Sequence, residues 1–166
     1  RAGPEVDVVS PTILAIDPGT TESAYVTYNA STATLIGLGK MPNNELRGAL
    51  AHRPWHDAPG VIVCEMIESY GMRFVGAETY ETCVWIGRFI AAAEPMRVER
   101  IFRTRVKEHL LGARKGKDSD VNQALADRFG GTAAKGTKRA PGPLYGVAGD
   151  IWAALAVAVT WADLHS

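Results

Sequence analysis

Two short apolar runs that each end in an acidic residue form the strongest pattern along the chain. Residues 13–16 (Ile-Leu-Ala-Ile) run into Asp17, and residues 61–64 (Val-Ile-Val-Cys) run into Glu65. A continuous apolar run of this length, bounded by turn residues, is typical of a buried strand. The pattern therefore predicts an acid at the end of each strand, where an unpaired charge is costly. For Asp17 alone a simpler interpretation exists, because Asp-Pro-Gly is also favourable turn chemistry.

The remaining pattern predicts an α/β fold. Residues 23–28 and 34–39 are β-prone, and a turn at 29–32 joins them into an antiparallel meander with the first strand. After residue 61, strands and helices alternate, which favours parallel pairing. We expect a five-stranded mixed sheet, a three-strand antiparallel meander plus parallel strands, with helices on both faces. The helices are expected at about 45–52, 75–94, 103–111, 118–129 and 149–164, and the fifth strand at 96–102.

The expected helix at 75–94 holds more large apolar residues than one buried stripe requires. Helical spacing places four positions on one stripe: Tyr80, Val84, Gly87 and Ala91. Three further apolar residues, Trp85, Ile86 and Phe89, then remain outside this stripe. We therefore expect part of this helix to contact a second copy of the chain in a homodimer.

The length and composition fit one domain with its own core. The 166 residues include 46% hydrophobic and 22% charged residues, which is ordinary for a globular protein. We expect a single domain over residues 11–166 and a disordered or vector-derived tail over residues 1–10. No apolar run approaches the roughly 20 residues of a membrane helix, and residues 1–10 lack the apolar segment of a secretory signal. We therefore expect no membrane partner. Cys64 lies in an apolar strand, so we expect a buried reduced thiol and a cytoplasmic location.

Charge is distributed unevenly although the net charge is zero. Residues 97–139 contain 12 Lys or Arg and 5 Asp or Glu, a net charge of +7, and the rest of the chain carries −7. A basic region on an otherwise acidic chain is a candidate binding surface for a polyanion such as DNA. The alternative is a solvated helical face with no ligand.

Three carboxylates form the candidate chemical centre. Asp17 and Glu65 end strands on the same side of the expected sheet, where sites in α/β folds lie. Asp150, expected in the first turn of the last helix, can complete the cluster. Such a cluster needs cations, because the acids repel one another when they lose water. Ligands that are all oxygen suit Mg2+ or Mn2+ rather than Zn2+. Two such ions can drive phosphodiester hydrolysis by activating a water and stabilising the leaving oxygen.

Three motifs occur in an order that resembles a known family. They are Ile-Asp-Pro-Gly-Thr at 16–20, Val-Cys-Glu at 63–65 and Gly-Asp-Ile-Trp-Ala-Ala-Leu-Ala-Val-Ala at 149–158. With the basic helix and loop at 105–125, they resemble the RuvC family of Holliday junction resolvases, within the ribonuclease H-like superfamily, and most of all its phage-borne members. The resemblance covers about residues 12–161.

The resemblance implies a homodimeric, Mg2+-dependent endonuclease that nicks branched DNA, especially four-way junctions. Mn2+ is expected to substitute for Mg2+. By position, Asp17, Glu65 and Asp150 are the metal-binding and catalytic carboxylates, and the products carry a 5′-phosphate and a 3′-hydroxyl. If the chain is phage-encoded, it acts in the cytoplasm of a bacterial host.

The sequence departs from the family at one position. The family's fourth carboxylate lies three residues after the match to Asp150, and this chain has Ala153 there. Glu68 and Asp118 are the candidates to replace it. Otherwise the second ion is held more loosely, or the protein cuts weakly and mainly binds DNA.

The resemblance also assigns DNA contacts. Lys107 falls where the family has a basic residue near the scissile phosphate, so it joins the catalytic set, and Lys117 has a similar place. Tyr70 matches an aromatic that stacks on bases near the crossover, a contact worth about 1–3 kcal/mol per base. The other candidates are basic residues expected to bind phosphates: Arg73, Arg103, Arg105, Arg114 and Lys115. The alternatives are a half-buried loop tyrosine and ordinary surface charges, and His109 is interpreted as a surface or interface residue rather than a general base.

Three other functions fit part of the pattern. The Asp17 turn is similar to the first phosphate loop of actin-like ATPases and sugar kinases, but those proteins flank the nucleotide with two such domains. A ribosomal-RNA-processing nuclease of the same superfamily shares the acids, but its chains are usually shorter and lack the basic region. A non-catalytic junction-binding protein fits Ala153, but pure binding gives no reason to cluster acids that face a phosphate backbone.

Overall fold

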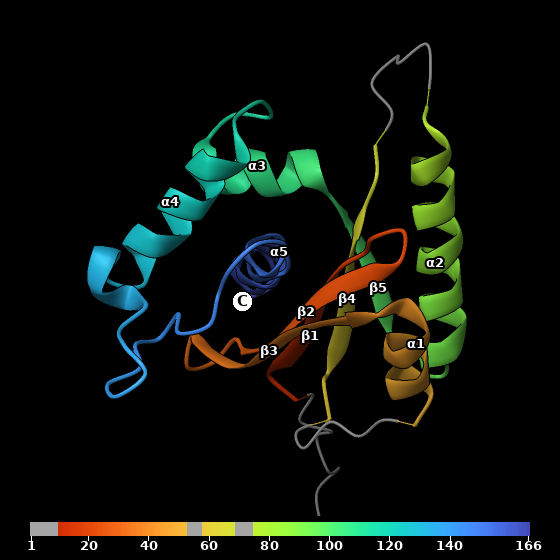
Figure 1. The fold of residues 1–166 in the computed structure, drawn as a ribbon, viewed down its shortest axis with the longest axis horizontal. Helices are drawn as coiled ribbons and strands as arrows, with labels where there is room; N and C mark the ends of the chain where they lie inside the picture. Colours follow the sequence, from red (N-terminus) through yellow and green to blue (C-terminus); the bar gives the residue numbers. More distant parts are fainter. Residues whose placement is uncertain (1–9, 53–57, 69–74) are drawn as a thin grey trace, which may run out of the picture.

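Five strands form one mixed sheet in the order β3-β2-β1-β4-β5 (Figure 1). The computed structural model describes residues 10–52, 58–68 and 75–166. The strands are β1 (Thr12–Asp17), β2 (Glu22–Asn29), β3 (Thr34–Pro42), β4 (Val61–Met66) and β5 (Val98–Phe102). The first three strands pair antiparallel, whereas β4 runs parallel to both β1 and β5. The predicted five-stranded mixed sheet is therefore confirmed.

Helices cover both faces of this sheet, as predicted. On one face lie α1 (Asn43–His52) and α2 (Ala77–Ala93). On the other face lie α3 (Arg103–Leu111), α4 (Asp118–Arg128) and α5 (Ile151–Leu164). A short 3-10 helix, η1 (Gly131–Ala134), lies within the segment between α4 and α5. Asp150 precedes α5 rather than lying in its first turn, a correction of one residue.

The strand pattern follows from a sheet that is buried on both faces. In β1, Ile13 and Ala15 belong to the core beneath α5, whereas Leu14 and Ile16 belong to the core beneath α1 and α2. Strands covered on both faces read as continuous apolar runs, because alternate side chains point to opposite cores. The same alternation directs the next residue, Asp17, toward the α5 face. Burial of the sheet thus determines on which face the first candidate acid lies.

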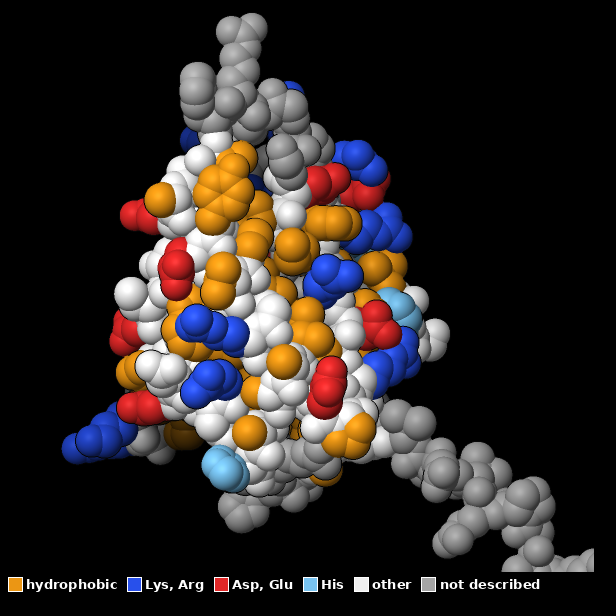
Figure 2. All heavy atoms as spheres, turned by 90° about the vertical axis from the view of Figure 1, so that its right-hand side faces the viewer, with side chains coloured by type: hydrophobic (Ala, Val, Ile, Leu, Met, Phe, Trp, Pro, Cys, Tyr) orange, Lys and Arg blue, Asp and Glu red, His pale blue; other side chains and the backbone are white. Residues whose placement is uncertain are grey.

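The apolar stripe predicted for α2 is wrong. Tyr80 and Val84, two of its four positions, have 63% and 47% of their surface exposed. The buried face consists of Thr82, Trp85, Ile86, Phe89 and Ala93. Trp85 and Phe89 pack with apolar residues of β1 and β4, because large side chains gain more from burial than the Gly and Ala of the predicted stripe. The residues assigned to a dimer interface are thus core residues, and the outer face of this layer carries other hydrophobic side chains among charged ones (Figure 2).

Three smaller expectations concern the cysteines, a membrane span and the start of the chain. Cys64 is a buried free thiol, and Cys83 is also free. Among the described residues, no helix combines the length and the apolar character that a membrane span needs. The expected tail at residues 1–10 lies outside the described residues apart from Ser10, and β1 begins at Thr12.

An ion network joins the three helices on the α5 face. Arg128 of α4 donates two hydrogen bonds to the carboxylate of Asp163 in α5, at 2.6 and 2.5 Å. His109 Nε2 of α3 lies 2.7 Å from the same carboxylate. Burial alone would raise the pKa of Asp163, but the hydrogen bonds from Arg128 and His109 outweigh burial and hold that pKa below its usual range. His109 therefore has a structural contact between helices, away from the candidate acids.

Replacement of Asp163 by Asn tests this network. Because the folded-state pKa of Asp163 is lowered, its ionised form stabilises the fold above the unfolded-state pKa of about 4, and this stabilisation is lost as the pH falls through the folded-state value. Asp163→Asn should lower the free energy of unfolding by about 2 kcal/mol at neutral pH. The difference from wild type should shrink toward zero in acid. Urea unfolding at a series of pH values measures it.

The matched control is Asp127→Asn, which changes an exposed acid of α4 that accepts a hydrogen bond from Gln123. This change should cost much less, because exposed polar pairs contribute little. A loss of stability in Asp163→Asn that stays constant from neutral to acid pH would contradict the assigned role of the ionised carboxylate.

Candidate active site

Asp17 and Glu65 lie side by side at the carboxyl edge of the parallel strands. Ile16 of β1 pairs with Cys64 of β4, so the two acids follow at the next position of each strand. Alternation directs both side chains toward the α5 face, because the residues two positions earlier belong to the core on that face. The acid side chains are only 15% and 12% exposed. The register of two buried strands thus brings two carboxylates together with little water around them.

Burial dominates the electrostatics of this pair. It raises the pKa of Asp17 from 3.8 to about 7, and the negative charge of Glu65 adds to the shift. Burial also raises the pKa of Glu65. Arg103 opposes both shifts, because a positive charge stabilises the ionised carboxylates. The protein therefore keeps two acids where the ionised forms need more positive charge than Arg103 supplies.

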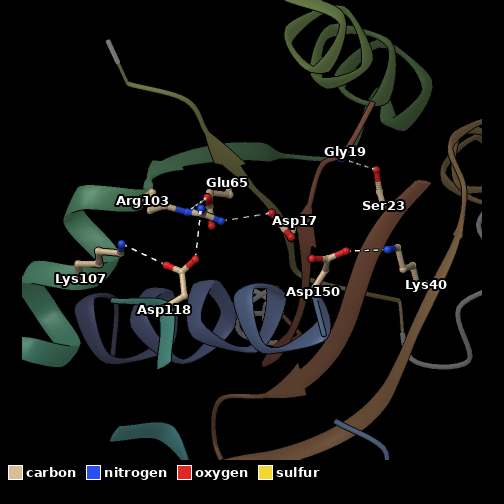
Figure 3. Close-up of polar contacts among 9 residues, drawn as sticks. All are labelled: Asp17, Gly19, Ser23, Lys40, Glu65, Arg103, Lys107, Asp118 and Asp150. Atoms are coloured by element: carbon tan, nitrogen blue, oxygen red, sulfur yellow. Dashed lines mark hydrogen bonds and ion pairs between the residues drawn. The ribbon is translucent and has the colours of Figure 1, made fainter. Parts of the chain in front are cut away.

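Arg103, the first residue of α3, lies among three carboxylates (Figure 3). Its Nε atom donates a hydrogen bond to Glu65 Oε1 at 2.6 Å. Its Nη2 atom lies 4.0 Å from Asp17 Oδ1, and its Nη1 atom lies 3.9 Å from Asp118 Oδ2. The parallel pairing of β4 with β5 explains this position, because β5 ends beside Glu65 and α3 begins at the next residue. Arg103 was predicted as a phosphate contact, and it is also an internal partner of the acids.

Asp150 lies beside the pair but its carboxylate is bonded from β3. Lys40 Nζ donates a hydrogen bond to Asp150 Oδ2 at 2.6 Å, and Lys40 also lies 3.8 Å from Glu22. The strand register places Asp17, Ala24 and Lys40 in one row across β1, β2 and β3. Figure 3 shows Asp150 between Asp17 and Lys40. The third acid thus reaches the site, but a lysine that the sequence did not single out neutralises it.

Lys107 and Asp118 continue the polar surface of the site on the other side of Arg103 (Figure 3). Lys107 Nζ donates a hydrogen bond to the carbonyl oxygen of Gly116 at 2.8 Å and lies 3.1 Å from Asp118 Oδ1. The Lys107 side chain is only 16% exposed. Asp118, Ala153 and the three candidate acids all line one small cavity of about 100 Å3. Asp118 therefore lines the same cavity as Ala153, the position at which the fourth carboxylate was expected.

A wider cleft of about 480 Å3 opens beside the acids. Its walls come from the turn after β1, the end of β4, the start of α2 and helix α3. Lys107 and Arg114 line it together with the two buried acids. Glu68 lines it as well, and its carboxylate accepts a hydrogen bond from Thr104. The cleft thus combines acids and basic side chains along one surface.

The other predicted DNA contacts lie outside the residues that line these two cavities. Arg105 faces solvent and forms an ion pair within α3. Lys115 and Lys117 are exposed in the connection between α3 and α4. Tyr70 and Arg73 lie outside the described residues. Of the predicted basic contacts, the structure therefore brings Arg103, Lys107 and Arg114 to the acids.

A buried polar network holds the turn that follows Asp17. The backbone N–H of Gly19 donates to Ser23 Oγ at 3.2 Å, and Asn43 Nδ2 donates to the Gly19 carbonyl at 2.9 Å. Ser23 Oγ donates in turn to Asn43 Oδ1 at 2.6 Å. A Cβ atom at position 19 would lie 2.2 Å from the carbonyl oxygen of Glu22, so the turn requires glycine. Contacts to β2 and α1 thus fix the backbone next to Asp17.

Sequence reasoning missed Lys40, Ser23 and Asn43. Lys40 reaches the site through strand register, which the sequence pattern of a meander does not specify. Ser23 and Asn43 are small polar residues at the borders of expected elements, where they usually serve turns and caps. Ser23 and Asn43 are both buried, and this burial distinguishes them from ordinary turn and cap residues. Burial is known only from the folded chain.

The donor chemistry of the site fits a divalent cation. Asp17, Glu65 and Asp150 offer only oxygen atoms, which Mg2+ prefers, and the buried pair needs positive charge. Within the described part of the chain, no three acidic, His or Cys side chains converge closely enough to hold a metal ion. Lys40 holds Asp150, and Arg103 holds Glu65. A cation bound by all three acids therefore requires these side chains to move closer together, while Lys40 and Arg103 compete for two of them.

Comparison of the sequence with protein-family models and with curated proteins gives no match. The fold, however, is similar to solved structures of Thermus thermophilus RuvC. One, of RuvC itself, is 17% identical over 90% of this chain and 92% of that chain, with a TM-score of 0.64. Another, of RuvC in complex with a Holliday junction substrate, is 18% identical over 90% of this chain and 91% of that chain, with a TM-score of 0.66. The chain therefore has the same fold as Thermus thermophilus RuvC, an α/β fold with a five-stranded mixed sheet.

Proposed function

We propose that this protein is a structure-selective DNA endonuclease that resolves four-way junctions and other branched DNA by metal-dependent phosphodiester hydrolysis. The observation that carries the proposal is the buried pair of Asp17 and Glu65, flanked by Arg103 and Lys107 at the edge of a cleft. A protein that only binds DNA gains nothing from two desolvated acids near a phosphate backbone. A protein that must bring a cation to a phosphate needs them.

Asp17, Glu65 and Asp150 would hold Mg2+, with Mn2+ as a substitute. Two bound ions would supply positive charge that activates the attacking water and stabilises the leaving oxygen. The role of the three side chains is to fix the position of that charge. The backbone at Asp17 is well suited to this role, because the hydrogen-bonded turn at Gly19 holds it.

The basic side chains would position the DNA. Lys107 is anchored by the Gly116 carbonyl and lines the cleft, so it can contact the phosphate that is cut. Arg114 lines the same cleft, and Lys115 and Lys117 extend the positive surface along the connection before α4. Such contacts are independent of base sequence and weaken as salt concentration rises. Selectivity for branched DNA then has to come from the shape of the substrate.

We also propose that the enzyme acts as a homodimer in the cytoplasm. A two-fold partner would place two sites on the two opposite strands of a symmetric junction. Tyr80 and Val84 are large exposed hydrophobic residues on α2, and they are the candidates for a contact between copies. The free thiols of Cys64 and Cys83 are compatible with a reducing compartment.

A second function deserves a direct test because of Ala153. Without a fourth carboxylate at that position, the fold could bind junctions and leave them uncut. Asp118 lines the same cavity as Ala153 and is the structural argument for retained cleavage. Glu68, the other candidate, is bonded to Thr104 in the wider cleft.

The first test compares a labelled four-way junction with a linear duplex, in Mg2+ and in chelator. We expect paired nicks in opposite strands that require both the junction and the metal. Asp17→Asn should reduce cleavage by about a hundredfold or more, because it removes a buried metal ligand. Glu45→Gln, an exposed acid on α1, is the matched control and should cut at the wild-type rate.

Full cleavage by Asp17→Asn at matched protein and Mg2+ would overturn the assignment of the acids. Tight binding of the junction without cleavage, in Mg2+ or Mn2+, would support the binding function instead. Equal cleavage of the junction and the duplex would overturn structure selectivity while leaving nuclease activity in place.

The dimer is tested by charge at the exposed face of α2. Val84→Glu and Tyr80→Glu should shift the protein from dimer to monomer in sedimentation velocity, because a buried unpaired charge is costly. Ile36→Glu places the same charge at a position of β3 that is 47% exposed, as Val84 is, and should leave the dimer intact. A wild-type protein that sediments as a monomer, or variants that stay dimeric, would contradict this interface.

A further inference from the structure

We propose that Arg103 competes with the divalent cation for Glu65 and Asp17, and that cation binding transfers its guanidinium from these acids to a DNA phosphate. The inference rests on the proposed function and concerns how the two ligands of the site depend on each other. It makes Arg103 a positioning residue that links cation binding to DNA binding.

The contacts of Arg103 place one guanidinium against the carboxylates that are proposed to hold the cation. Its Nε atom donates to Glu65 Oε1 at 2.6 Å, and its two terminal nitrogens lie 4.0 Å from Asp17 and 3.9 Å from Asp118. A cation that binds Glu65 through Oε1 displaces this hydrogen bond, and one that binds through the other oxygen is repelled by the nearby guanidinium. A guanidinium also stays charged at any physiological pH, so it cannot relieve the repulsion by losing a proton. The guanidinium and a divalent cation therefore compete for the negative charge of Glu65.

The position of Arg103 also suits a contact with a DNA phosphate. It is the first residue of α3, and its side chain is 46% exposed although its guanidinium lies against buried acids. It lines the wider cleft together with Lys107 and Arg114. A guanidinium binds phosphate with the same fork geometry that it uses for carboxylate. Release from Glu65 thus makes a phosphate contact available on the same surface as the other basic residues.

Lys107 differs from Arg103 in a way that makes the exchange specific. Lys107 Nζ is held by the Gly116 carbonyl at 2.8 Å and by Asp118 at 3.1 Å, and its side chain is 16% exposed. These contacts tie it to the connection before α4. Arg103 is held chiefly by Glu65 and Asp17. Binding of a divalent cation, which neutralises these two acids, therefore also frees Arg103.

The first experiment measures cation affinity without DNA. Isothermal titration with Mg2+, repeated with Mn2+, compares wild type with Arg103→Gln and Arg103→Lys. Arg103→Gln should bind the cation about tenfold more tightly, and Arg103→Lys should fall between the two, because lysine keeps the charge but loses the fork. Arg97→Gln is the matched control: Arg97 has the same 2.6 Å contact to a glutamate, Glu99, at the opposite end of β5. It should bind the cation as wild type does.

The second experiment counts phosphate contacts through the salt dependence of junction binding. The slope of log K against log salt concentration should be smaller by about 1 for Arg103→Gln than for wild type in Ca2+, because one phosphate contact is lost. In chelator the two slopes should agree, because Arg103 is then occupied by Glu65 and Asp17. Ca2+ serves as the probe so that the junction stays intact during the titration.

Several outcomes overturn the proposal. Unchanged or weaker cation binding by Arg103→Gln removes the competition, and equal slopes in Ca2+ remove the transfer to phosphate. If Arg103→Gln fails to fold in chelator, Arg103→Lys decides the question by the same two readouts. If wild type binds no cation and cuts no junction, the proposed function itself falls. If wild type does both while Arg103→Gln binds the cation as wild type does, only the present inference falls.

Discussion

Two carboxylates buried side by side impose the main constraint on this structure. Asp17 and Glu65 lie at the ends of adjacent parallel strands and point to the same face of the sheet. Strand register and the alternation of side chains therefore place the two carboxylates next to each other. Their mutual repulsion and the loss of water must be offset by positive charge. Arg103 at the start of α3 supplies part of that charge, and Lys107 and Arg114 line the cleft beside the acids. Within the basic region at residues 97–139, Arg103 and Lys107 are thus the electrostatic counterpart of the acids at the strand ends.

Packing and electrostatics are coupled through α5. This helix covers the face toward which both acids point, and its apolar residues from Ala154 to Val159 are buried in the same core as Ala15 and Val63. Asp150 immediately precedes α5. The helix that excludes water from this face therefore also positions the third acid. The network of Asp163, at the other end of α5, ties the helix to α3 and α4. The position of the third acid therefore depends on contacts made more than ten residues away.

Local patterns in the sequence were sufficient to predict the strands, the helices and the acids at the strand ends. The strand-end acids could be found because buried strands read as apolar runs, and the order of strands and helices gave the mixed sheet. The buried face of α2 could not be identified, because Ala and Gly at several positions leave two stripes with similar spacing and only packing decides for Trp85 and Phe89. Lys40 was missed because it depends on how three strands align, and Ser23 and Asn43 because small polar residues give no sign of burial in advance. The site was thus predictable in its acids and in part of its basic residues, and not in the contacts that orient them.

The turn at Gly19 and the basic residues that follow α3 tolerate sequence change differently. On one side, position 19 admits no side chain, and Ser23 and Asn43 bond to the backbone of Gly19 and to each other. On the other side, Arg114 lines the wider cleft and is exposed, so it can be exchanged without disturbing the core. Variation at such exposed positions can therefore change the charge of the cleft, while the buried acids stay constant. A fold divided in this way can acquire new substrates through surface mutations alone.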